Sequence, residues 1–336
     1  MNTKILTTKD EDIKIAAEII KTGGLVAFPT ETVYGLGANA LDAVCVKKVY
    51  AAKGRPSDNP MIVHIAKASD IEQLASYVSE AAFVLMDKFW PGPLTLVLNK
   101  KPEVPKETTG GSDTVAVRMP KDDVAIALIT QSGCPIAAPS ANLSGKPSST
   151  KPEHVIDDLS GKIDAIIAGG DCKIGIESTV LDVTGEVPMI LRPGFVTAED
   201  IENAIGIKPR LDSSLLRKEP ESESGEEFKP KSPGMKYKHY APKAQMTIIE
   251  GSNNKVKDEI ERIKKLKEAE GISVGVMLFE DEALSEAAHD FFAKLRELDE
   301  QGVDLILAGA LSDTDGVGFA VMNRMLKSAG YNIIRV

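Results

Sequence analysis

The chain has 336 residues, of which 43% are hydrophobic and 27% charged, and its formal net charge is −10. The length favours two domains, and the composition is that of a globular protein with a sizeable core. The negative charge argues against broad nucleic-acid binding but leaves room for a local basic pocket.

No apolar run in the sequence approaches the roughly 18 residues of a membrane span. Residues 1–10 lack the apolar core of a signal peptide, so we expect a cytoplasmic protein. Three cysteines, Cys45, Cys134 and Cys172, lie far apart and form no CxxC pair. We therefore expect neither a disulfide framework nor a structural zinc site, and we interpret each cysteine as a small buried apolar residue.

The chain begins with an expected amphipathic helix over 10–22, followed by a short buried strand at 25–28. A polar turn leads to a second helix at 42–52, and Lys53 and Arg55 stand around a glycine at its end. Cations at such a position suit a polyphosphate, because Arg offers a planar fork and Lys a mobile charge. Favourable charges at a helix C-terminus explain them equally well, so the spacing alone leaves both interpretations open.

The elements that follow are a strand, two helices and two further strands, expected at 61–65, 69–78, 80–89, 94–98 and 113–120. In the last of these strands, Thr114 and Arg118 lie on one face by the period of two. A threonine and an arginine on the same face could form an anion site. A half-exposed sheet face would show the same pattern.

The first domain continues with helices expected at 123–132, 152–159 and 197–204 and strands at 134–139, 163–168, 175–182 and 189–194. The strand at 134–139 runs into a small-residue turn with Ser140 and Asn142. Such turns present N–H groups to phosphate or carboxylate, although Ser and Asn are also common turn residues. Arg192 ends the last strand and would need a charged partner, from the protein or from a ligand.

Residues 208–243 have the composition of a linker, with prolines among Lys, Glu and Ser. Their second half nevertheless carries Tyr237, His239 and Tyr240, which have no core to fill and favour a docking role. A second α/β pattern follows, with strands expected at 246–250, 272–279, 303–307 and 331–336 and helices at 253–270, 284–297 and 316–329. This alternation predicts a small, mostly parallel sheet with covering helices.

Nine segments with distinctive sequences occur in order: PTETVYGLG (29–37), KGRP (53–56), DTVAVRMP (113–120), PSANLSG (139–145), ESTVLD (177–182), LRPG (191–194), KYKHYAP (236–242), LRELDEQGVDLILA (295–308) and GFAVMNRMLKSA (318–329). Together they resemble the two-domain Sua5 branch of the YrdC/Sua5 family, the L-threonylcarbamoyladenylate synthases. The resemblance covers almost the whole chain, and only 210–232 carries none of it.

The resemblance implies an α/β fold in three parts. A YrdC-type twisted mixed sheet with a deep cleft would span 1–207, a linker or lid 208–243, and a small Rossmann-like Sua5 domain 244–336. It also implies the synthesis of L-threonylcarbamoyl-AMP from L-threonine, bicarbonate and ATP, with release of pyrophosphate. Mg²⁺ would accompany ATP, with no permanently bound cofactor. A downstream transferase would use the product on tRNA adenosine 37, and neither membrane binding nor stable nucleic-acid binding is expected.

The roles implied for individual residues fall into three groups. The catalytic residues would be Lys53, Arg55 and Arg118. ATP would meet Arg55, Asn59, Thr114, Ser140, Asn142, Ser148, Arg192, Tyr237 and His239, and threonine would meet Thr32, His64, Arg118, Ala138 and Ser178. No residue is expected to bind a metal. The run Ser148-Ser149-Thr150 leaves the nucleotide-contacting hydroxyl uncertain by one residue.

These residue types fit the reaction that the resemblance implies. A carbamate of threonine would attack the α-phosphate of ATP, so negative charge builds on phosphate oxygens, and catalysis rests on positioning and cationic stabilisation. Lys53, Arg55, Arg118 and Arg192 should then converge. His64 could be a base or a structural hydrogen-bonder. Because the carbamate is labile in water, we expect the linker to act as a lid.

Three other functions were weighed. A carbamoyltransferase of hydrogenase maturation also carries a YrdC-like domain, but it adds acylphosphatase and zinc-finger segments that this sequence lacks. An RNA-binding module would suit a concave basic cleft, and its binding should weaken with salt. A non-catalytic scaffold would leave four cations on motif turns without a partner.

Overall fold

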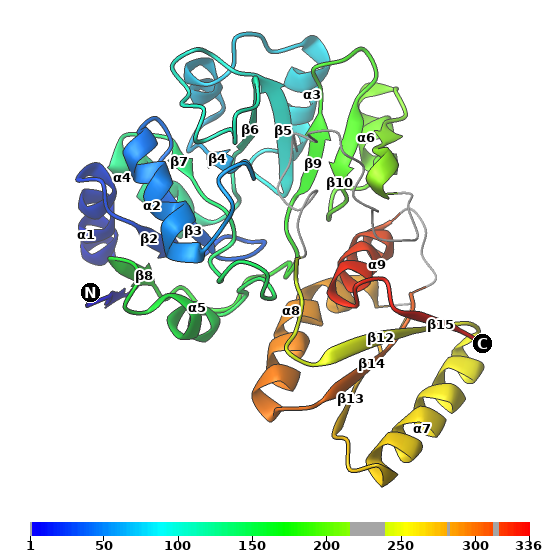
Figure 1. The fold of residues 1–336 in the computed structure, drawn as a ribbon. Coiled ribbons are helices and arrows are strands. Elements are labelled where there is room, and N and C mark those ends of the chain that lie inside the picture. The colour runs from blue at the N-terminus through cyan, green and yellow to red at the C-terminus, as the bar shows by residue number, and fades with distance from the viewer. Residues whose placement is uncertain (1, 216–238, 281–282, 312–315) are drawn as a thin grey trace.

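The computed structural model describes residues 2–215, 239–280, 283–311 and 316–336 (Figure 1). The described strands form two sheets, one of eleven strands in the first part of the chain and one of four strands in the second. Every helix in these ranges is too short or too polar to cross a bilayer. This arrangement confirms the predicted α/β class with a large mixed sheet and a smaller parallel one.

The first sheet has the strand order β1-β8-β2-β3-β7-β4-β6-β5-β9-β10-β11. Its strands are β1 (Lys4–Leu6), β2 (Val26–Phe28), β3 (Gly35–Asn39), β4 (Ile62–His64), β5 (Leu94–Asn99), β6 (Thr114–Arg118), β7 (Ile136–Ala137), β8 (Ala165–Ile167), β9 (Thr179–Asp182), β10 (Met189–Arg192) and β11 (Arg210–Leu211). The helices of this part are α1 (Asp10–Lys21), α2 (Ala43–Lys53), α3 (Glu80–Phe89), α4 (Asp123–Ser132), α5 (Pro152–Leu159) and α6 (Ala198–Ile205), with short 3₁₀ helices at η1 (Ala68–Gln73) and η2 (Ser213–Leu215).

The central strands of this sheet bring distant motifs together. β4 and β6 are parallel, and their register places His64 opposite Arg118. β3 runs antiparallel to both β2 and β7, and a single bridge joins Gly35 to Ser140 beyond β7. The segments 29–37, 61–65, 113–120 and 139–145 therefore meet in the middle of the sheet.

Local signals explain where the helix before the cationic turn begins and ends. The carboxylate of Asp42 accepts hydrogen bonds from the backbone N–H groups of Val44 and Cys45 at 2.8 and 3.3 Å, which caps the N-terminus of α2. Gly54 ends the helix at a φ of 62°, a left-handed conformation that glycine adopts without steric cost. The chain then turns so that Arg55 faces the centre of the sheet.

Four expectations about this part were wrong or incomplete. The segment 69–78 is not one helix: η1 ends at Gln73, and Ser76 N–H then donates to the Asn99 carbonyl at 2.9 Å. Strands β1, β3 and β11 were not expected. β11 lies inside the predicted linker and pairs with β10, so the first sheet continues past residue 207. The boundaries proposed for the domains otherwise stay predictions.

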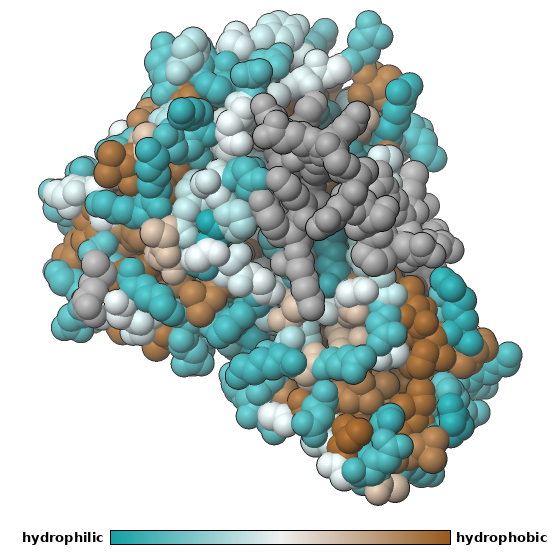
Figure 2. All heavy atoms as spheres, in the orientation of Figure 1, coloured by the Kyte–Doolittle hydropathy of each residue, from teal (hydrophilic) through white to brown (hydrophobic). Residues whose placement is uncertain are grey.

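The second sheet is entirely parallel, in the order β13-β14-β12-β15, which confirms the expected topology. Its strands are β12 (Gln245–Glu250), β13 (Val274–Met277), β14 (Leu305–Gly309) and β15 (Ile333–Arg335), and its helices are α7 (Asn253–Ala269), α8 (Leu284–Gln301) and α9 (Val317–Ser328). Figure 1 shows α8 and α9 on the side that faces the first sheet and α7 on the far side. On the face seen in Figure 2, hydrophilic and hydrophobic side chains alternate over both parts.

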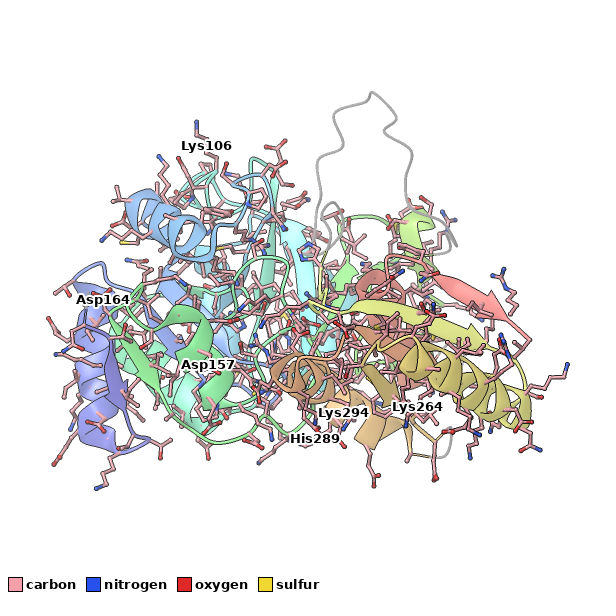
Figure 3. All side chains as sticks on the ribbon, turned by 60° about the horizontal axis from the view of Figure 1, so that its bottom comes forward. Lys106, Asp157, Asp164, Lys264, His289 and Lys294 are labelled. Carbon is pink, nitrogen blue, oxygen red and sulfur yellow. The ribbon has the colours of Figure 1, made fainter. Side chains whose placement is uncertain are left out.

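The two parts pack closely against each other. Val33 and Ile176 of the first part belong to the same buried apolar cluster as Phe291 and Phe292 of α8. A Cβ on Gly175 would lie 2.3 Å from the His289 carbonyl oxygen, so only glycine allows this approach of α8. Figure 3, which labels His289 on α8 and Asp157 on α5, shows these two helices side by side.

Candidate active site

A pocket lies where the central strands of the first sheet meet the end of the linker. Its lining includes many of the predicted site residues: Thr32, Arg55, His64, Arg118, Ala138, Ser140, Ser178, Arg192 and His239. Further lining residues were not assigned a role from the sequence: Thr30, Val33, Tyr34, Gly35, Ile62, Pro139, Glu177 and Tyr240. The positively charged side chains of the lining are three arginines, and the acidic one is a single glutamate.

Arg118 is held at one end of the pocket by three contacts. Its Nε donates to the Gly92 carbonyl at 3.1 Å and its Nη1 to Thr32 Oγ1 at 2.8 Å. Its Nη2 lies 2.6 Å from Glu31 Oε2 in a buried ion pair without hydrogen-bond geometry. A guanidinium carries five N–H bonds, so Arg118 keeps donors for a carboxylate ligand.

The hydroxyl of Thr32 has a defined direction. Thr30 Oγ1 donates its one hydrogen to the Val33 carbonyl at 2.6 Å, and Thr32 Oγ1 lies 2.9 Å from Thr30 Oγ1. Thr32 must therefore donate to Thr30 while it accepts from Arg118. One lone pair of Thr32 remains for a ligand, so this hydroxyl can accept from an ammonium, amide or hydroxyl donor.

His64 is buried in the lining and His239 is half-buried there, and both are neutral imidazoles. Burial lowers the pKa of both rings to about 3, with a further contribution from Arg118 at His64 and from Arg55 at His239. His64 Nδ1 and His239 Nε2 have no hydrogen-bond partner among the described residues. A neutral ring nitrogen without a partner can accept a proton or position a donor, so both functions considered for His64 stay open.

Lys53 does not line the pocket, although the sequence suggested a phosphate contact. It is 2% exposed, and its Nζ donates to the backbone carbonyls of Ser140 and Asn142. Burial, followed by the charge of Arg55, lowers the pKa of the Lys53 ammonium well below its usual value. Within this structure Lys53 positions the Ser-x-Asn turn, where Ser140 Oγ also donates to Asn142 Oδ1 at 2.5 Å.

Arg55 reaches the pocket from the glycine turn after α2. Its Nε donates to the Asn59 carbonyl at 3.3 Å and its Nη2 to the Pro60 carbonyl at 2.9 Å, which fixes the plane of the guanidinium. Burial lowers the pKa of Arg55 to about 10, so the group stays charged near neutral pH. Asn59 is buried behind Arg55 and does not itself line the pocket.

Arg192 and Ser178 form another part of the pocket wall. Nε and Nη2 of Arg192 donate to the Ser178 carbonyl at 3.1 and 3.0 Å, and Ser178 Oγ lies 2.8 Å from Thr95 Oγ1. Burial lowers the pKa of Arg192, and the nearby Glu177 carboxylate counteracts this. The protein thus supplies the partner that a buried strand arginine requires.

Several predicted site residues lie behind the pocket instead of in its wall. Ser148 donates to Glu177 Oε1 at 2.5 Å, and Thr114, at the start of β6, pairs with Ser112 Oγ at 2.9 Å. Lys53, Asn59 and Asn142 are likewise absent from the lining. Tyr237 lies outside the described residues. The roles in substrate binding suggested for all of these residues stay predictions.

Two wall residues could have been assigned from the sequence. Tyr240 belongs to the aromatic cluster noted in the linker, and it packs on Phe292 with ring centroids 5.1 Å apart. Glu177 stands beside Ser178 in the motif that enters β9. The side chain that pairs with Glu177 comes from the second part of the chain, and the sequence around Glu177 does not indicate it.

Comparison with known proteins shows the family of the chain. The family model Sua5–YciO–YrdC, described as "Telomere recombination", matches residues 18–194. A second family model, "Threonylcarbamoyl-AMP synthase, C-terminal domain", matches residues 196–330. The chain belongs to the Sua5–YciO–YrdC family. Its two matched segments, taken in order, identify it as a two-domain Sua5-type member of that family.

Relatives cover nearly the full length of this Sua5-type chain. The threonylcarbamoyl-AMP synthase of Pyrococcus abyssi is 50% identical over 96% of this chain and 96% of its own, and that of Bacillus subtilis is 47% identical over 99% and 97%. The crystal structure of P. abyssi Sua5 complexed with L-threonine superposes with a TM-score of 0.93 at 47% identity, covering 99% of this chain and all of that one. The fold expected from the resemblance is confirmed.

Proposed function

We propose that this protein synthesises L-threonylcarbamoyl-AMP from L-threonine, bicarbonate and ATP and releases pyrophosphate. The observation that carries the proposal is the convergence of Arg55, Arg118 and Arg192 on one buried pocket beside two neutral imidazoles. Three fixed cations suit a ligand set rich in phosphate and carboxylate. Full-length relatives named threonylcarbamoyl-AMP synthase support the choice of this reaction.

The threonine end of the pocket would be the end that contains Arg118. The free N–H groups of Arg118 would bind the substrate carboxylate, and the remaining lone pair of Thr32 would accept from a threonine donor. Ala138 and Ser178 complete this wall. The substrate amine would then lie where a neutral ring nitrogen of His64 or His239 can accept a hydrogen bond from it.

The nucleotide end would be the end with Arg55, Arg192 and Ser140. The neutral amine nitrogen attacks the carbon of CO₂ with loss of a proton, or the carbon of bicarbonate with loss of water, to give a carbamate. A carbamate oxygen then attacks the α-phosphorus of ATP. The bond from the α-phosphorus to the bridging oxygen breaks, and the electron pair leaves with pyrophosphate. The two arginines would stabilise the phosphate charge in the transition state, and no protein nucleophile is needed.

Magnesium is proposed as part of the substrate. The described residues include no group of three His, Cys, Asp or Glu side chains arranged to hold a metal. The lining carboxylate of Glu177 is already paired. Mg²⁺ commonly keeps several waters and binds through substrate phosphates, so MgATP as a unit fits this pocket. A cytoplasmic location, and use of the product by a transferase acting on tRNA, belong to the same proposal.

The proposed reaction predicts a specific dependence of pyrophosphate release. With ATP, threonine and bicarbonate present, the protein should release pyrophosphate, and omission of threonine or of bicarbonate should each abolish the release. The measurement is a coupled pyrophosphate assay with carbonate-depleted buffer as the control. Release without either co-substrate would show a pyrophosphohydrolase and contradict the proposal, and absence of ATP binding would contradict the role of the arginines.

The linker is proposed as a lid over this pocket, since its described end places His239 and Tyr240 in the wall. Replacing residues 230–238 by a Gly-Ser segment of equal length keeps these two side chains. The change should lower pyrophosphate release by about 100-fold, because an open site lets water reach the carbamate. The melting temperature serves as the control for folding. Activity equal to that of the native chain would exclude the lid.

A further inference from the structure

Glu177 is the acidic side chain in the lining of the active-site pocket. It is 6% exposed, and its neighbours along the wall include Ser178 and Arg192. A triphosphate brings several negative charges into the same buried space. An uncompensated carboxylate there would repel it, because like charges interact strongly where water is excluded.

Arg324 of α9 compensates this carboxylate from the second part of the chain. Its Nε donates to Glu177 Oε2 at 2.7 Å and its Nη2 to the Glu177 carbonyl at 3.2 Å. Its Nη1 donates at 2.8 Å to the carbonyl of Pro193, the residue directly after Arg192. Arg324 is fully buried at 0% exposure, and it does not line the pocket.

We infer that Arg324 is a positioning residue for the nucleotide site, which neutralises and orients Glu177 so that the pocket accepts the triphosphate of ATP. The second part of the chain would thus supply an electrostatic component of a site that it does not line. This inference rests on the proposed function, because it takes ATP as the ligand. It assigns a task to α9 beyond that of packing against the first sheet.

The hydrogen bonds around Glu177 support a fixed carboxylate. Ser148 donates to its Oε1 at 2.5 Å, so each oxygen has its own donor. Burial alone would raise the pKa of Glu177, but Arg324, Arg192 and Ser148 together lower the pKa to about 2. Glu177 is therefore ionised at every pH at which the protein would work, and its charge must be offset by neighbours.

A double-mutant cycle separates this role from simple packing. ATP binding is measured by calorimetry on the full chain and on three variants: Arg324→Met, Glu177→Gln and the double variant. The Arg324→Met change should weaken ATP binding by about tenfold or more in the native background, since it leaves the carboxylate in the pocket without its ion-pair partner. In the Glu177→Gln background the same change should weaken it by less than about threefold, because no charge remains to be offset.

Several outcomes would overturn the inference. One is that Arg324→Met leaves ATP binding unchanged. Another is that Arg324→Met weakens ATP binding equally in the native and in the Glu177→Gln background, which would mean that Arg324 acts without Glu177. If Arg324→Met alone does not fold, the double variant is compared with Glu177→Gln. A difference below about threefold then supports the inference, and a larger one contradicts it.

Arg296 of α8 provides a matched control at the same interface. It is also buried, and its Nη2 donates to Asp158 Oδ2 at 2.8 Å and to the Pro147 carbonyl at 2.7 Å. If the Arg296→Met variant binds ATP more weakly than the native chain does, adding Glu177→Gln to it should not restore that affinity, because Arg296 pairs with Asp158 and not with Glu177. An equal improvement in both arginine variants would show a general effect of the glutamine and contradict the inference. If the native chain binds no ATP, the proposed function itself fails.

Discussion

The Arg118→Ala variant is expected to raise the KM for threonine by at least about 100-fold, while ATP affinity changes by less than about threefold. The reason is the hydrogen bond of Arg118 to Thr32, the residue with which it would bind threonine, whereas Arg55 and Arg192 would hold the nucleotide. A charge-assisted pair with the substrate carboxylate would be lost, and water cannot replace it in a buried site. The measurement is pyrophosphate release against threonine concentration, together with calorimetric ATP binding.

The same substitution should also destabilise the fold, and this effect can be separated. Arg118→Ala leaves Glu31 buried without its ion-pair partner, which costs about 3–5 kcal/mol of unfolding free energy. Adding Glu31→Gln should recover most of that stability without restoring threonine use. Equal losses for threonine and ATP in the stabilised double variant would instead place Arg118 at the nucleotide end.

The elements with an uninterrupted apolar pattern were predictable from the sequence. The helix expected at 10–22 is observed at Asp10–Lys21, and it buries Ile13, Ala16, Ala17 and Ile20 at helical spacing. The strand expected at 94–98 is observed at Leu94–Asn99. The helix packs one face on a core and the strand is buried on both faces, so a helical apolar period and a continuous apolar run report these two elements directly.

Elements fixed by long-range pairing were not predictable in this way. β3 contains Gly35 and Gly37, which suggest a turn, yet a Cβ on Gly37 would lie 2.8 Å from the Phe28 ring and 2.7 Å from Ile136. The glycine is there because neighbouring strands approach closely. The expected helix at 69–78 ended early for a similar reason, since the chain after η1 pairs with the end of β5.

The candidate site shows the same difference between local motifs and long-range contacts. Residues within compact motifs, such as Arg55, Arg118 and Ser178, were predicted, and all of them line the pocket. The partners of such residues were not, because they are far away in the sequence: Arg324 and Glu177 are 147 positions apart. Lys53, a cation within a motif, binds backbone carbonyls inside the fold and does not line the pocket, and its suggested catalytic role stays a prediction.

Acid should destabilise this protein well above the pH at which its carboxylates titrate. Burial lowers the pKa of His64 and His239 from 6.5 to about 3, so the folded state binds fewer protons than the unfolded state between these values. Stability is therefore complete above pH 6.5 and falls as the pH drops below it. The expected loss is about 2 kcal/mol for each ring between pH 6.5 and 5. His154, a further buried ring whose pKa is lowered to about 3, should add to this loss.

Urea unfolding at several pH values from about 7.5 to 5 measures the slope of the unfolding free energy against pH. Two variants identify the source of this slope. His64→Gln removes one buried ring and should reduce the slope by about 1.4 kcal/mol per pH unit. His239→Gln removes the other lining ring whose pKa is lowered to about 3 and should reduce the slope in the same way. The Glu177 carboxylate does not interfere, because its pKa of about 2 means that its contribution is lost only as the pH falls below about 4.5. An unchanged slope in His64→Gln would mean that the His64 ring binds as many protons in the folded as in the unfolded protein, which would contradict its lowered pKa.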